Sequence, residues 1–135
     1  MQPIELIEIP KVGNSDIDKE HELFAVVVNR IVCSIKNNDS PDYLESLVNE
    51  LIKYAEFHFL SEQNMMRRLD YPAFLQHKNE HENLLAGLRN RIFSLDYEYI
   101  DFSGLIDYMI GWFKKHISNT DKKLVEFLRE KDYVK

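Results

Sequence analysis

The chain has 135 residues, 44% of them hydrophobic, and a formal net charge of -6 from 17 basic and 23 acidic side chains. This length suits one compact domain with a sizeable core. The acidic balance, with no cluster of Lys and Arg, argues against nucleic-acid and anionic-membrane partners. A start without a signal peptide and the lack of a long apolar run predict a soluble, cytoplasmic protein.

The single cysteine, Cys33, excludes an internal disulfide and a metal site built from thiolates. We expect it to pack as a small hydrophobic residue, with a redox role as the alternative.

Apolar residues at helical spacing predict four helices and no strands. After an irregular arm (residues 1–15), the helices are expected over roughly 16–37, 41–69, 72–95 and 103–131. Ser40 is the expected N-cap of the second helix, with Pro41 at its first position. Short connections between long helices make sequential neighbours antiparallel. The predicted fold is all-α: an up-down-up-down antiparallel four-helix bundle with an irregular N-terminal arm.

Polar residues interrupt the apolar face of every predicted helix. In chain order, these residues are His21 in the first helix, His58 and Glu62 in the second, His77 and His81 in the third, and His116 and Asp121 in the fourth. No Lys or Arg lies on these faces to neutralise the acids. Because an unpaired buried carboxylate is costly, these acids need a cationic partner.

Each of these residues also has a structural interpretation when taken alone. His21 could be a hydrogen-bonded core histidine, Glu62 and His58 could form a buried ion pair, and Asp121 could be an exposed helix residue. Together, however, they favour a metal centre. Seven donors exceed the needs of one metal, so we expect two metals that share the carboxylates and an oxygen bridge, with one position left open. Nitrogen and oxygen donors with an open position favour a redox-active metal, iron before manganese.

Asp121 follows His116 by five residues, a step that turns it about 140° away in a straight α-helix. Both can reach one site only if the helix is distorted. The sequence therefore predicts a π-bulge between residues 114 and 122.

The motifs "IDKEHELF", "HFLSEQ", "HKNEH" and "WFKKHISNTD" together resemble the hemerythrin family, in particular bacterial single-domain hemerythrins. The resemblance covers nearly the whole chain and implies one hemerythrin-like domain over residues 1–135. It further implies a non-haem di-iron centre, with an oxo or hydroxo bridge, that binds dioxygen reversibly. One departure is that the arm, with "IEIPKVG", lacks the Trp that family members often carry there.

The resemblance also implies a role for each donor. One iron would be held by His77, His81 and His116, the other by His21 and His58, and both by the bridging Glu62 and Asp121. The family's apolar oxygen pocket carries over onto residues whose alternative role is simply bundle core: Phe59, Trp112, Phe113 and Ile117.

Three functions remain open at this point. We favour dioxygen storage or delivery over sensing, because the chain offers no output module. The main alternative is a di-iron enzyme that reduces peroxide, nitric oxide or nitrite, and the third is iron handling. A small acidic bundle without an evident extra apolar face is expected to be a monomer.

Overall fold

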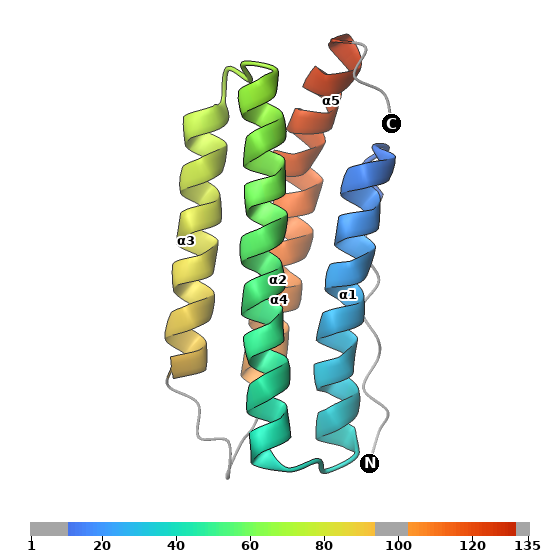
Figure 1. Cartoon of the computed structure of the whole chain (residues 1–135), viewed down its shortest axis with the longest axis vertical. Coiled ribbons are helices and arrows are strands. Elements are labelled where there is room, and N and C mark those ends of the chain that lie inside the picture. The colour runs from blue at the N-terminus through green and yellow to red at the C-terminus, as the bar shows by residue number, and fades with distance from the viewer. Residues whose placement is uncertain (1–10, 94–102, 132–135) are drawn as a thin grey trace.

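The computed structural model describes residues 11–93 and 103–131, and within these ranges every regular element is helical. The elements are α1 (Ser15–Lys36), α2 (Pro41–Arg68), α3 (Phe74–Phe93), α4 (Ser103–His116), the π-helix η1 (Ile117–Asp121) and α5 (Lys122–Glu130). Figure 1 shows α1, α2, α3 and α4 alternating in direction, with α5 continuing α4 upward. The predicted all-α antiparallel four-helix bundle is confirmed.

The observed helix limits agree with those predicted from the sequence to within two residues wherever the two can be compared. Residues 11–14 of the expected arm lie before the first helix, while residues 1–10 and the connection after α3 fall outside the described residues. Ser40 caps α2 as expected, because its hydroxyl accepts the backbone N–H of Tyr43 at 3.3 Å. Asn14, which the sequence did not single out, caps α1 by accepting two backbone N–H groups at 3.1 Å.

Two apolar clusters fill the bundle, and in α1, α2 and η1 a polar residue lies between them along the chain. The larger cluster includes Phe24, Phe59 and Ile117. The smaller one, nearer the start of α1 and the end of α2, consists of Ile17, Met66, Leu124, Val125 and Leu128. His21 therefore lies between Ile17 and Phe24, Glu62 between Phe59 and Met66, and Asp121 between Ile117 and Leu124. The polar side chains form a layer that is closed off by apolar side chains on either side.

Cys33 does not pack in the core, and that prediction was wrong: its side chain is exposed. The buried face of α1 contains Ile31, and a step of two residues along a helix turns Cys33 about 200° away from it. None of the described helices is both long enough and apolar enough to cross a membrane.

Candidate metal centre

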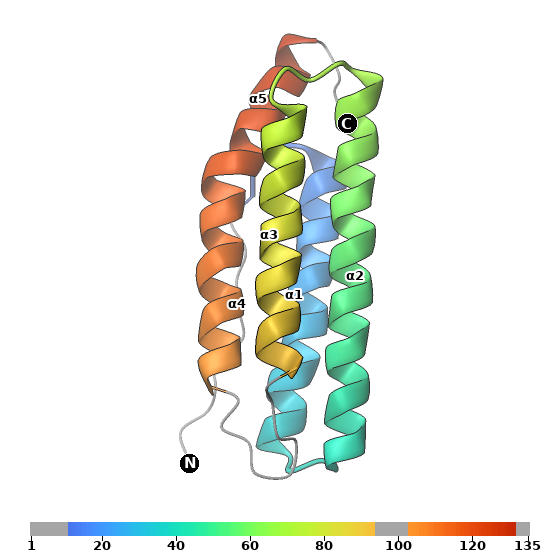
Figure 2. The ribbon, with the colours of Figure 1, turned by 90° about the vertical axis from the view of Figure 1, so that its left-hand side faces the viewer.

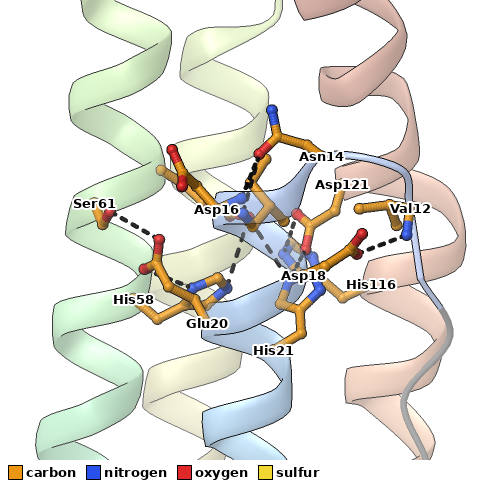
Figure 3. A network of polar contacts seen from close by, with 12 residues as sticks. Val12, Asn14, Asp16, Asp18, Glu20, His21, His58, Ser61, His116 and Asp121 are labelled. Carbon is orange, nitrogen blue, oxygen red and sulfur yellow. Dashed lines mark hydrogen bonds and ion pairs between the residues drawn. The ribbon is translucent and has the colours of Figure 1, made fainter. Parts of the chain in front are cut away.

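The seven donors expected from the sequence all lie buried in one place, contributed by α1, α2, α3, the end of α4 and η1. None is more than 2% exposed: His21, His58, Glu62, His77, His81, His116 and Asp121. In Figure 3, His21 from α1 and His116 and Asp121 from the α4–η1 segment point toward one another. Four stretches far apart in the sequence thus bring their polar residues to the same height along the bundle axis.

The donors form two overlapping groups that share both carboxylates. One group holds Glu62, Asp121 and three histidines (His77, His81 and His116), and the other holds Glu62, Asp121 and two (His21 and His58). Within each group, one donor atom from every residue lies within 4.8 Å of the others. Two carboxylates common to two clusters are what a pair of bridged metal ions requires.

Every histidine turns its Nε2 atom toward the acids. Asp121 has His21 Nε2 at 3.0 Å, His77 Nε2 at 3.1 Å and His116 Nε2 at 3.0 Å. Glu62 has His81 Nε2 at 3.1 Å and His58 Nε2 at 3.6 Å. The Nδ1 atoms are thereby left on the outer edges of the rings, which is the orientation that ligation through Nε2 needs.

The protein alone does not satisfy this layer, and the unmet groups are those a cation would bind. Although these donor atoms lie at ion-pair distance, several make no hydrogen bond: Nε2 of His21 and His58, both carboxylate oxygens of Glu62, and Oδ2 of Asp121. Among the described residues, no Lys or Arg is buried with them. Because unpartnered polar atoms in a core are costly, the donor set fits two metal ions.

The π-helix explains how Asp121 reaches the site. Residues Ile117–Asp121 form one π turn directly after His116, and Asp121 is fully buried. Figure 2 shows the α4–α5 rod bending at this level. The prediction of a π-bulge between residues 114 and 122 is confirmed, and with it the common orientation of His116 and Asp121 toward the bundle interior.

Charges within the site overcome the effect of burial on most of its groups. Burial and the nearby Asp121 carboxylate would raise the pKa of Glu62, but His58, His77 and His81 lower it to about 2. Burial would likewise raise the pKa of Asp121, yet contacts with histidines, His116 first, hold it well below its usual range. The two acids are therefore ionised at neutral pH.

The histidines respond in the opposite direction. Burial alone would lower the pKa values of His77 and His116, but the acids raise them to about 9 and about 10. The pKa of His81 is lowered, mainly by burial. Burial alone would lower the pKa of His58 too, but Glu62, Glu20 and Asp121 together outweigh this effect and raise it. Without metal, the two carboxylates are thus balanced by protonated histidines, His77 and His116 among them. Metal ions would have to displace these protons, because only a neutral imidazole ligates.

Three histidines have partners on their outer Nδ1 atoms, and these partners were missed by the sequence analysis. Glu20 faces His58 Nδ1 at 3.3 Å and also accepts the Ser61 hydroxyl at 3.2 Å (Figure 3). Gln63 faces His81 Nδ1 at 3.2 Å, and Glu80 faces His116 Nδ1 at 2.6 Å. Such contacts fix the tautomer and the ring orientation of a ligating histidine.

These outer partners follow a pattern. Glu20, Gln63 and Glu80 each directly adjoin a donor of their own helix, yet each contacts a histidine of the next helix along the chain. Some polar residues next to a donor lie at the edge of the buried face and meet the neighbouring helix, whereas others, such as Glu82 beside His81, are exposed. Adjacency to a donor is therefore a sequence signal that includes all three partners but does not single them out.

Three of the four residues expected to line an apolar pocket are buried: Phe59, Phe113 and Ile117. The Phe59 ring stacks on His81 with centroids 4.0 Å apart, and Phe113 meets His21 edge-on at 5.5 Å. The side chain of the fourth residue, Trp112, lies outside the part of the chain that the structure describes. The two phenylalanines thus bring apolar surface directly against candidate ligands from both donor groups.

Comparison with known proteins agrees with this geometry. Residues 12–128 match the family model described as the hemerythrin HHE cation binding domain. The chain is 27% identical to a bacteriohemerythrin of Clostridium acetobutylicum, over 86% of this chain and 94% of that protein. It is 26% identical to one of Ralstonia nicotianae (97% and 93%) and 31% identical to myohemerythrin-1 of Phascolopsis gouldii (84% of each). The chain therefore belongs to the hemerythrin HHE cation binding domain family.

Proposed function

We propose that this protein binds dioxygen reversibly at a pair of iron ions held by the seven buried donors. The observation that carries the proposal is the pair of donor groups sharing Glu62 and Asp121, with three histidines in one and two in the other. Family membership and the names of the relatives, bacteriohemerythrin and myohemerythrin-1, support it.

The unequal number of histidines determines where a small molecule would bind. If both ions are six-coordinate and share Glu62, Asp121 and one bridging oxygen, the group with three histidines is complete. The group with His21 and His58 lacks one ligand. The bound iron pair would supply the electrons for reversible dioxygen binding at that vacant position.

The protein's own contribution is to hold the donors and to exclude water. His21 Nε2 lies 3.0 Å from Asp121 Oδ2, and Glu20 approaches the outer nitrogen of His58. Phe113, which is 1% exposed, covers the edge of the His21 ring. If metals are bound there, an apolar cover at this histidine would keep water from the open position and so slow irreversible oxidation of the metals.

The donor chemistry favours iron among the candidate metals. Five imidazoles and two carboxylates form a nitrogen-rich set of intermediate softness with no thiolate, which suits a metal that changes oxidation state. Four points stay predictions: a role in storage or delivery rather than sensing, the cytoplasmic location, the monomeric state, and the single domain over residues 1–135.

An oxygen-electrode experiment separates a carrier from an enzyme. Protein loaded with ferrous iron should take up about one dioxygen per two irons, release it when the gas phase is exchanged, and show no continuing consumption when a reductant is added. Continuing consumption would favour the di-iron enzyme instead. The variant Glu62→Gln should lose uptake, while Glu82→Gln, altered on the exposed side of α3, should retain it.

A further inference from the structure

Glu80 makes more contacts with the metal-site region than either of the other outer partners. Its Oε1 atom accepts the Nδ1–H of His116 at 2.6 Å. The Thr120 hydroxyl donates to the same carboxylate, lying 2.8 Å from Oε1 and 2.7 Å from Oε2. One side chain of α3 thus binds two residues of the opposing segment at once.

These two residues lie at opposite ends of the π turn. His116 directly precedes the turn, and Thr120 is its last residue before the candidate bridging ligand Asp121. His116, the residue before the turn, makes no side-chain cap hydrogen bond to it. π turns are rare and occur mostly as single-turn distortions of a helix. The carboxylate of Glu80, which belongs to another helix, binds a residue at each end of this π turn and so can stabilise it.

The outer contacts made by Glu20 and Gln63 differ from that of Glu80 in their length and in the segments that they connect. The Glu20 contact to His58 is 3.3 Å and the Gln63 contact to His81 is 3.2 Å. Glu20 does bind a second residue, Ser61, but Ser61 belongs to the regular helix α2. The Nδ1 atoms of His21 and His77 are buried with no hydrogen-bond partner. Glu20 and Glu80 thus each join a candidate ligand to the residue that precedes a candidate bridging acid, Glu62 or Asp121. Of these three outer contacts, the one made by Glu80 is the one that spans a π turn.

The Glu80 carboxylate and its contacts with His116 and Thr120 lie where solvent can reach them. A surface cavity of about 430 Å³ is lined by Glu80, Leu84, Lys115, His116, Asn119 and Thr120. The Glu80 side chain is 40% exposed, whereas that of His116 is 1% exposed. Glu80 can therefore be changed without creating a buried void, which makes it a suitable position for a test.

We propose that Glu80 is a positioning residue of the metal centre: it orients the ring of His116 and, through Thr120, holds the π turn in the form that brings Asp121 to the metals. This inference rests on the proposed metal centre but not on dioxygen binding. Removing an outer partner of a metal ligand typically lowers metal affinity by about 10- to 100-fold. Because Glu80 supports two ligands, Glu80→Ala should fall at the upper end of that range.

The test measures cobalt(II) binding to the metal-free protein by competition with a chelator, with the cobalt absorption spectrum as the second readout. Glu80→Ala should bind cobalt about 100-fold more weakly. Glu80→Gln retains an oxygen that accepts the Nδ1–H of His116, so it should recover most of the affinity but shift the spectrum. Thr120→Val, which leaves the His116 contact intact, should weaken binding by about 10-fold.

The matched control is Glu82→Ala, which removes a carboxylate two residues away on α3 whose side chain is 60% exposed. Its cobalt affinity and spectrum should equal those of the parent. Equal losses in Glu80→Ala and Glu82→Ala, or parental affinity and spectrum in Glu80→Ala and Thr120→Val, would overturn the proposal. Circular dichroism of each metal-free variant establishes that the affinities compare folded proteins.

Cobalt binding separates this inference from the proposed function, because it needs no dioxygen. If the iron-loaded parent fails to bind dioxygen while Glu80→Ala still loses cobalt, the proposed function fails and the positioning role stands. If the parent binds dioxygen and Glu80→Ala retains both cobalt affinity and spectrum, the positioning role fails alone.

Discussion

Protons on His77 and His116 should compete with metal for the buried site. The pKa values of these residues are raised to about 9 and about 10, so both are protonated at neutral pH in the metal-free protein. A metal can bind them only after both protons leave. Loading the site at pH 7 should therefore release about two protons from these histidines alone.

The magnitude follows from the number of protons displaced. While both histidines remain protonated in the free protein, their two protons alone should make the apparent metal affinity rise about 100-fold for each pH unit. Between pH 6 and pH 8 this amounts to about 10⁴-fold. The raised pKa of His58 acts in the same direction. Histidines with the ordinary pKa of about 6.5 would give a much smaller rise, because they are mostly neutral above pH 7.

Isothermal titration with zinc(II) in two buffers of different ionisation enthalpy measures the proton release directly. An NMR titration of the metal-free protein supplies the individual pKa values, and His77 and His116 should stay protonated up to about pH 9. In Asp121→Asn both values should fall toward the ordinary range, because Asp121 contributes strongly to each shift. Release of no protons at pH 7, or an affinity that stops rising above pH 7, would refute this reasoning.

Stability measurements test further parts of the structure. The raised pKa values of His77 and His116 stabilise the metal-free fold fully below about pH 6.5, and this contribution is lost as pH rises through about 9 and 10. Thermal unfolding of the metal-free protein should therefore occur at a lower temperature at pH 10 than at pH 6. An unchanged unfolding midpoint would contradict the pairing of these histidines with the acids. Phe113→Ala, which removes a ring stacked on Phe24 at 3.9 Å, should cost about 3–5 kcal/mol in chemical denaturation, and a loss below about 1 kcal/mol would argue against close packing there. Asn14→Ala should cost about 1 kcal/mol through the lost cap of α1, whereas Cys33→Ser, at an exposed position, should change stability by less than about 0.5 kcal/mol.

The helical repeat made the donor set predictable. His58 and Glu62 occupy steps of the same apolar face as Leu51 and Ala55, and all four are buried. Burial of a polar residue in such a series can be read from spacing alone. The π turn was also predictable, because two potential ligands five residues apart cannot share a face of a regular α-helix.

Other features depend on packing that spacing does not specify. Glu20, Gln63 and Glu80 lie at the edges of helix faces, where the neighbouring helix decides whether a side chain meets solvent or a histidine. The rotation of α1 about its axis placed Cys33 outside the core, although its residue type favours burial. Asn14 became a cap because the chain turns into α1 there, which the apolar pattern starting at Ile17 does not reveal.

The central claim is that the seven donors hold two irons that bind dioxygen reversibly. Its most direct test is to load the protein with iron, count the metal per chain, reduce it without oxygen, and record visible absorption through a cycle of air and argon. The account predicts two irons per chain and an absorption band that appears in air and disappears under argon. A single iron per chain, or a band that persists under argon because the metals oxidised once and stayed oxidised, would contradict it.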